Sequence, residues 1–164
     1  MRHQFDTKMD RCINQAIAEQ LTPRPAALSL ADAALLADYA REAAEQLNVP
    51  IVFSLVNASG QQRYFFSMDN ALLISHTLAE QKAWTAVALK MPTHQLAREV
   101  QPGASLYGLQ NTPRICCFGG GLPCWSDGVL LGGLGISGGS VEDDIAIATA
   151  ALARFSHTRF PLTS

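Results

Sequence analysis

The spacing of apolar residues divides the chain into a short N-terminal segment and one larger domain. Over residues 1–21, apolar side chains recur at intervals of three and four, which predicts a short amphipathic helix. Two prolines within residues 22–27 then end the helix, because proline lacks an amide donor and restricts the residue before it. We therefore expect residues 1–21 to form a helix on a proline-containing linker, outside the main core.

The larger domain is expected to span residues 28–157, followed by a tail at 158–164. Ser29, with Asp32 three positions later, matches an acidic variant of the capping box, so a helix is expected from there to Leu47. Further helices are expected over 71–90, opened by Asp69 or Asn70, and over 93–99 and 140–155. Strands are expected over 51–56, 63–66, 114–118 and 129–136. Two hairpins framed by helices indicate an α+β domain with an antiparallel sheet.

Composition and charge exclude several classes of protein. Of the 164 residues, 48% are hydrophobic and 16% are charged, which is ample for a core. The formal net charge of −2 leaves no basic excess for a phosphate backbone, so we expect no nucleic-acid partner. No apolar run is long enough to span a membrane, and the N-terminus lacks the apolar centre of a secretory signal. We therefore expect a cytoplasmic protein with no membrane partner.

The cysteines do not have the spacing of a metal site. Cys12, Cys116, Cys117 and Cys124 contain no C-x-x-C pair, and no two histidines stand at metal-ligand spacing. A structural zinc site is therefore not expected. In a reducing cytoplasm, we interpret the adjacent Cys116 and Cys117 as small hydrophobic residues buried in a strand.

A glycine pattern between residues 133 and 138 matches G-x-G-x-x-G, which is typical of dinucleotide-binding folds. No further strand is expected after it to complete a βαβ unit. No acidic residue stands about 20 positions later to hold a ribose. We therefore interpret these glycines as residues that let a strand turn and pack closely against neighbouring backbone.

Glycine clusters at two strand ends suggest a shallow ligand cleft. Ser137 and Gly138 precede an expected helix, whose N-terminal amides carry partial positive charge and could hold a carboxylate or a propionate. Gly119, Gly120 and Gly121 likewise leave bare backbone. Close packing of the loops is an equally good explanation of both clusters.

Five segments together point to a known family. They are Val56-Asn-Ala-Ser-Gly60, Met68-Asp69 with Ala71, Lys82-Ala-Trp-Thr-Ala86, Phe118-Gly-Gly-Gly-Leu-Pro123 and Gly132-Gly-Leu-Gly-Ile-Ser-Gly138. In this order they resemble the GlcG/HbpS-like family, which includes the C-terminal domain of PduO-type corrinoid adenosyltransferases. The resemblance covers about residues 28–155, and the segments after residues 119 and 130 look most like the PduO branch.

The resemblance implies a profilin-like fold, in which helices surround a five-stranded antiparallel sheet, and assembly into homo-oligomers. It also implies haem, or a corrinoid as the alternative tetrapyrrole, as ligand, in a family with members described as haem-degrading or redox-sensing. The adenosyltransferase domain of PduO has no counterpart here, so that activity is not expected. The family usually has Asp at the position of Asn57, which puts any role of that carboxylate in doubt.

Histidine is the commonest axial ligand of haem iron, and two histidines lie in or near the matched region. His76 is the first candidate and His94 the alternative, while an ordinary surface or hydrogen-bonded histidine is the other interpretation of each. Ligation of one iron by two histidines across subunits is one geometry. Lys82, on the helix of His76, could contact a propionate or be a solvated charge.

The leading hypothesis is an oligomeric haem- or tetrapyrrole-binding accessory protein for a cobalamin- or radical-enzyme pathway in a bacterial microcompartment. Residues 1–21 resemble encapsulation peptides, which would bring the protein into the lumen by binding shell or core enzymes. The alternative is a helix that packs on its own domain or on a neighbouring subunit. Two other functions stay open: a haem-dependent or small-molecule redox enzyme, and a ligand-free structural adaptor. No Ser-His-acid arrangement is apparent, so we name no catalytic residue.

Overall fold

The computed structural model describes residues 11, 13, 14 and 27–159. Its elements are α2 (Leu30–Leu47), β1 (Val52–Asn57), β2 (Gln62–Ser67), α3 (Leu73–Leu89), α4 (Thr93–Glu99), a 3-10 turn (Leu109–Asn111), β3 (Gly121–Ser126), β4 (Val129–Ser137) and α5 (Val141–Arg159). The helix predicted over residues 1–21, the linker at 22–27 and the tail at 158–164 lie almost wholly outside the described residues. None of the helices described is long and apolar enough to cross a bilayer.

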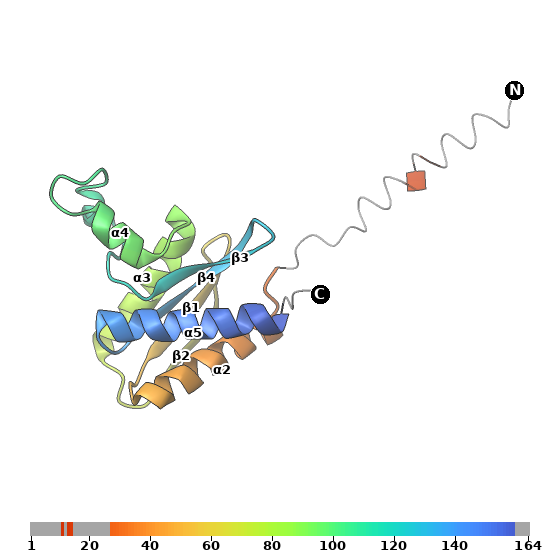
Figure 1. Cartoon of the computed structure of the whole chain (residues 1–164), viewed down its shortest axis with the longest axis horizontal. Helices are drawn as coiled ribbons and strands as arrows, with labels where there is room; N and C mark the ends of the chain where they lie inside the picture. Colours follow the sequence, from red (N-terminus) through yellow and green to blue (C-terminus); the bar gives the residue numbers. More distant parts are fainter. Residues whose placement is uncertain (1–10, 12, 15–26, 160–164) are drawn as a thin grey trace, which may run out of the picture.

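The strands form one antiparallel sheet in the order β2-β1-β4-β3 (Figure 1). This confirms the α+β class and the antiparallel sheet flanked by helices. Within the part of the chain that the structure describes, the sheet has four strands, and the expected count of five is wrong. Because β4 pairs with both β1 and β3, it lies in the centre and connects the two hairpins.

The strand predicted over 114–118 is also wrong. Arg114 has a left-handed backbone with φ of 71°, and the segment after it is irregular until β3 begins at Gly121. The Cys116 amide donates to the hydroxyl of Thr85 on α3, at 3.0 Å, instead of joining a strand ladder. Cys116 is buried and Cys117 is half-buried. The apolar run at 115–118 therefore belongs to a loop that packs under a helix and not to a strand.

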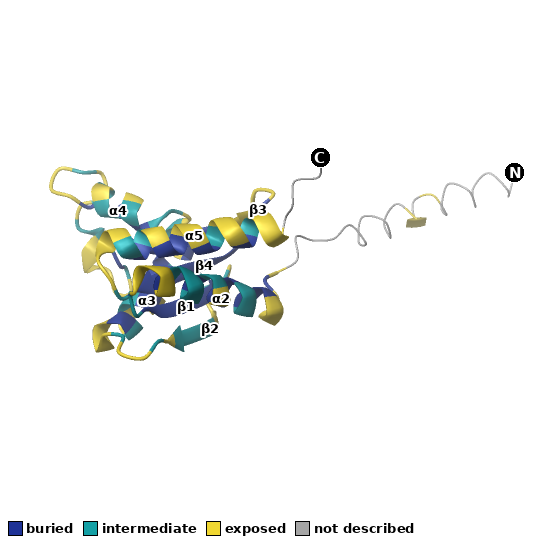
Figure 2. Ribbon diagram, turned by 60° about the horizontal axis from the view of Figure 1, so that its bottom comes forward, coloured by how far each residue is buried: buried dark blue, intermediate teal, exposed yellow. Residues whose placement is uncertain are grey.

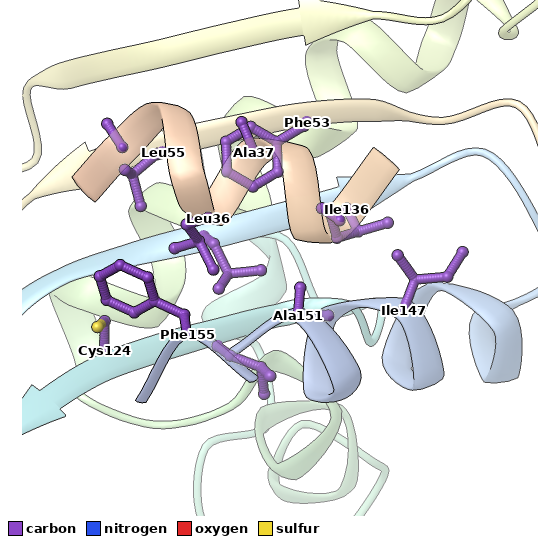
Figure 3. Close-up of a cluster of buried hydrophobic side chains, with 14 of the residues drawn as sticks. Leu36, Ala37, Phe53, Leu55, Cys124, Ile136, Ile147, Ala151 and Phe155 are labelled. Atoms are coloured by element: carbon purple, nitrogen blue, oxygen red, sulfur yellow. The ribbon is translucent and has the colours of Figure 1, made fainter. Parts of the chain in front are cut away.

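The main core lies between the sheet and the pair α2 and α5 (Figure 1). Figure 3 shows Phe53 of β1 and Ile136 of β4 facing this layer, with Leu36 of α2 and Phe155 of α5 opposite them. All four side chains are fully buried, and each contributes roughly 1.5–3 kcal/mol relative to an exposed position. Figure 2 shows α5 with exposed residues along its outer side, as an amphipathic helix requires.

Hydrogen bonds at the start of α2 confirm the predicted capping box. Ser29 and Asp32 form a capping box, with both hydrogen bonds at 3.0 Å. The other carboxylate oxygen of Asp32 accepts from Arg159 at 2.8 Å, which joins the start of α2 to the end of α5. Burial raises the pKa of Asp32, but hydrogen bonds from Ser29 and from Arg159 outweigh burial and leave the pKa below its usual value. Asp32 therefore stabilises the fold as a carboxylate.

Helix α3 covers the opposite face of the sheet and lies directly on β4. A Cβ atom at Gly133 would stand 2.8 Å from the Ala83 carbonyl oxygen, and one at Gly135 would overlap the Ala79 carbonyl. Any side chain at these positions would push the helix away from the strand. The structure therefore supports the interpretation of the G-x-G-x-x-G glycines as sites of close backbone approach.

Each edge strand carries an irregularity in its hydrogen-bonding pattern. Pro123 in the middle of β3 has no amide hydrogen to donate. In β2 the pairing passes from Leu55–Tyr64 to Val56–Gln62, so that the exposed Arg63 is an extra, bulged residue.

Candidate functional site

Side chains that could bind a ligand lie between α3 and the hairpin of β1 and β2. His76, Glu80 and Trp84 recur every four residues and therefore share one side of α3. Hydrogen bonds and ring contacts join this side to the hairpin, through Ser54, Gln62, Phe65 and Ser67. We call this set of seven residues the α3–hairpin seam.

His76, the first candidate ligand of the sequence analysis, lies half-buried in the seam. Its ring centroid is 5.6 Å from that of Phe65, and its Nε2 is 3.1 Å from the Ser67 hydroxyl oxygen. That hydroxyl donates its own hydrogen to the Met68 carbonyl, at 3.3 Å. In the tautomer with its hydrogen on Nε2, His76 donates to Ser67, and Nδ1 has a free lone pair.

The start of α3 exposes an apolar surface one turn before His76. Leu72, Leu73 and Ile74 are 61%, 86% and 58% exposed. The expected start at Asp69 or Asn70 is wrong: Leu72 occupies the N-cap position, and no side chain caps the helix there. Three adjacent large apolar side chains in water are unfavourable, so this surface suits an apolar ligand or another subunit. The Leu-Leu-Ile run is the signal for this surface in the sequence, although the run alone is equally typical of a buried helix.

The other end of the seam contains a hollow of about 140 Å³. Its lining includes Ser54, Gln62 and Glu80 of the seam, together with Arg114. The Gln62 amide donates to Glu80 at 3.2 Å and to the Ser54 hydroxyl at 3.5 Å. The Arg114 guanidinium lies over the Trp84 ring, 4.5 Å from its centroid. The sequence gives no sign of a site at Arg114, because the apolar residues after it are typical of a buried strand.

Lys82 lies outside the seam, on the side of α3 that is buried against β4 and α5. Its ammonium is 2.7 Å from an Asp144 carboxylate oxygen and donates to the Ile136 carbonyl at 2.8 Å. The lysine side chain is 2% exposed, so it is not a solvated charge. Burial raises the pKa of Asp144, and Lys82 and the amides of Gly139 and Gly138 lower it part of the way back. The pair connects α3 to the first turn of α5.

Both glycine clusters are close-packed where the sequence suggested a cleft. Cβ atoms at Gly119, Gly120 and Gly121 would meet Ile145, the Ile136 carbonyl and the Lys82 carbonyl, respectively. A Cβ atom at Gly138 would overlap the Pro50 carbonyl, and the Ser137 hydroxyl donates to Ser75 at 3.2 Å. Close packing, the alternative that the sequence left open, therefore describes both clusters.

His94 lies on α4, which follows the C-terminal end of α3, whereas His76 lies near the N-terminal end. One subunit therefore does not bring the two histidines together. His94 is half-buried, and its Nδ1 is buried without a hydrogen-bond partner among the described residues. Only Nε2 of His94 is therefore placed to reach a ligand outside the fold.

Comparison with known proteins gives matches over most of the chain. The family model for the HbpS-like haem-degrading protein matches residues 28–153. Corrinoid adenosyltransferase PduO of Salmonella typhimurium is 53% identical over 131 residues, which are 79% of this chain and 39% of PduO. A 15.0 kDa protein from the dhaT-dhaS intergenic region of Citrobacter freundii is 44% identical over 80% of this chain and 94% of its own length. The chain thus spans 39% and 42% of the two PduO proteins that it matches.

Solved structures share the fold as well as the sequence. The crystal structure of a PduOC–haem complex is 52% identical, with a TM-score of 0.76, over 78% of this chain and 94% of that chain. The crystal structure of HbpS is 29% identical, with a TM-score of 0.73, over 82% and 94% of the two chains.

Proposed function

Because the chain belongs to the family of HbpS-like haem-degrading proteins, we propose that it is an oligomeric haem-binding accessory protein. The observation that carries the proposal is the PduOC–haem complex, whose chain shares 52% of its residues with this one across 94% of its length. A corrinoid is the alternative tetrapyrrole, since two PduO relatives are corrinoid adenosyltransferases.

The residues of the seam fit an iron porphyrin. A haem iron needs a nitrogen ligand with a lone pair, and Nδ1 of His76 would provide one in the tautomer that donates from Nε2 to Ser67. A porphyrin also needs an apolar surface, which the exposed Leu72, Leu73 and Ile74 supply beside His76. When bound, haem supplies the redox chemistry of its iron. The protein residues orient the histidine and cover part of the ring.

A second copy of the chain would complete such a site. The apolar surface at the start of α3 can cover one side of a porphyrin, and the same surface of a second subunit can cover the other side. In this arrangement His76 from each subunit ligates the iron. His94 remains the alternative ligand, through Nε2. The arrangement predicts that haem shifts the protein toward its larger assembly, which analytical ultracentrifugation measures.

Haemin titration followed by absorbance tests the proposal. We expect a saturable, red-shifted Soret band that is lost in His76→Ala and kept in His94→Ala. His157→Ala, at the exposed end of α5, is the matched control. Loss of the band in His94→Ala alone would transfer the ligand role to that residue. A band that never saturates in the wild type would refute haem binding.

Degradation of haem is a second candidate function, favoured by the description of the family. It predicts a protein-dependent loss of the Soret band when peroxide is added to the complex. Stable absorbance over many hours with peroxide would refute haem degradation and leave haem binding in an accessory role as the proposed function.

We further propose that the protein serves a cobalamin- or radical-enzyme pathway inside a bacterial microcompartment. The PduO relatives and the amphipathic pattern of residues 1–21 support this setting. Residues 1–21 would then bind a shell or core enzyme through their apolar side. Deletion of these residues should abolish co-purification with shells and leave the haem spectrum unchanged. Unchanged co-purification would refute the targeting role.

A further inference from the structure

The hollow at the Trp84 end of the seam has polar groups that the fold itself leaves available. Three other arginines, Arg41, Arg154 and Arg159, pair with carboxylates. The Arg114 guanidinium contacts the Trp84 ring, but it has no hydrogen-bond or ion-pair partner among the residues described. The arginine is therefore positioned by stacking, and its N–H groups stay available at the edge of the hollow.

The backbone at Arg114 is held in an unfavourable conformation. Its φ of 71° lies in the left-handed region, which a long side chain seldom adopts. Thr85 holds the backbone directly after this residue, because its hydroxyl donates to the Arg114 carbonyl at 3.2 Å and accepts from the Cys116 amide at 3.0 Å. Backbone strain that is held in place by neighbours is typical of functional positions. Here the strained turn brings the guanidinium over Trp84 and to the hollow.

The floor of the hollow supplies a second donor. Ser54 is fully buried, and its oxygen accepts from the Gln62 amide at 3.5 Å. Its hydroxyl hydrogen has no acceptor within the described part of the chain and can donate to a ligand. Arg114 and Ser54 both line this hollow of about 140 Å³, and a guanidinium and a hydroxyl are suitable donors to the two oxygens of a carboxylate with a short carbon chain. We propose that this hollow is a carboxylate-binding site in which Arg114 and Ser54 are the donors.

Glu80 tunes the affinity of the site. Its carboxylate lines the same hollow, where the Gln62 amide binds it at 3.2 Å. A second carboxylate in the hollow is repelled by this charge, so Glu80→Gln should bind the ligand more tightly than the wild type does. This variant keeps the size of the side chain, removes its charge and replaces one acceptor oxygen by an amide donor.

Two sources of the carboxylate fit the same chemistry. Glu80, which lines the hollow, lies on the same side of α3 as His76 and one helical turn after it, so a propionate of a haem bound at His76 could enter the hollow. In that case the inference rests on the proposed function. A free short-chain carboxylic acid is the other source, and it does not need haem.

Two titrations distinguish these sources. In the first, sodium propionate is added to a Trp125→Phe protein, and Trp84 fluorescence reports binding in the hollow. In the second, the affinities for haemin and for haemin dimethyl ester are compared, since the ester lacks the propionate charges. Each is repeated with Arg114→Gln, which keeps a side chain on the strained backbone. Arg98→Gln, an exposed arginine on α4, is the matched control.

We expect haemin to bind at least about tenfold more tightly than its ester in the wild type and in Arg98→Gln, which is the effect of one charge-assisted contact. The preference should disappear in Arg114→Gln and grow in Glu80→Gln. A saturable propionate signal that Arg114→Gln abolishes, without a preference for haemin over its ester, assigns the site to a free acid. If Arg114→Gln changes neither titration, the proposal is overturned. If haemin does not bind at all, the proposed function fails, and the propionate titration still decides whether the hollow binds carboxylates.

Discussion

The buried pair of Lys82 and Asp144 predicts a large and specific loss of stability when one charge is removed. Asp144→Asn takes away the negative charge but keeps an oxygen that can accept from the Gly139 amide, which donates to Asp144 at 3.1 Å. The Lys82 ammonium would then be buried with the Ile136 carbonyl as its remaining acceptor. The variant therefore tests the electrostatic role of the pair with little change of shape.

The expected loss follows from the burial of the pair. Both side chains are at most 5% exposed, and the two charged atoms are 2.7 Å apart. Removal of one partner from such a pair typically costs about 3–5 kcal/mol, because the other charge stays out of water. With a urea dependence of about 2 kcal/mol per molar, typical of small domains, the midpoint of unfolding should fall by roughly 2 M.

Lys82→Met should instead show a deficit that depends on pH. Burial raises the pKa of Asp144, and without Lys82 this effect has less opposition. The folded variant then binds a proton more tightly than the unfolded chain does. Its stability therefore rises as the pH falls from the raised pKa toward the usual pKa of a carboxyl group. Urea unfolding at pH 5 and at pH 8 measures this, and the deficit should be smaller at pH 5.

The double variant Lys82→Met/Asp144→Asn provides the control, because it removes both charges. It should recover to within about 2 kcal/mol of the wild type, since replacement of a whole buried pair is much less costly than breaking it. A double variant as unstable as the sum of the two single variants would refute the reasoning. The loss would then come from packing and not from an unpaired charge.

Three further predictions concern packing, pH and thiol reactivity. Gly135→Ala should lower the free energy of unfolding by about 3 kcal/mol, because its Cβ would overlap a carbonyl of α3; a loss below about 1 kcal/mol in urea unfolding would contradict this. Since the pKa of Asp32 is lowered, the stability that its charge contributes should be full at pH 7 and be lost progressively as the pH falls below about 4, so the difference between wild type and Asp32→Asn should shrink over that acidic range. In a Cys12→Ser protein at pH 8, an aromatic disulfide reagent should modify the half-buried Cys117 and spare Cys124, which is buried with its pKa raised to about 11; rapid modification of Cys124 in the folded protein would contradict the structure.

The sequence alone predicts the parts of the structure that depend on residues close together in the chain. The capping pair Ser29 and Asp32 and the end of α2 at Leu47 depend on contacts within five positions, and the structure confirms them. Ser140 and Asp143 likewise bond each other at the start of α5. Because these motifs involve residues within one helical turn, they can be recognised from the residue types and their spacing.

The surroundings of residues whose partners are far away in the sequence could not be predicted in the same way. Lys82 has the pattern of a surface lysine until Asp144, 62 positions later, is placed beside it. The loop at Arg114 has the apolar run of a strand, and only contact with Thr85 shows why it is not one. His76 could be identified as a candidate, whereas its contact with Phe65 depends on the register of the hairpin.

The irregular edges of the sheet have a consequence for the behaviour of the protein at high concentration. An open sheet can grow by adding a strand from another molecule, which is a route to fibrils. On one edge Pro123 cannot donate to an incoming strand, and on the other the bulge at Arg63 breaks the register and places a charge there. Strand exchange between molecules is therefore blocked at both edges. Crowding would then favour other contacts between molecules over growth of the sheet.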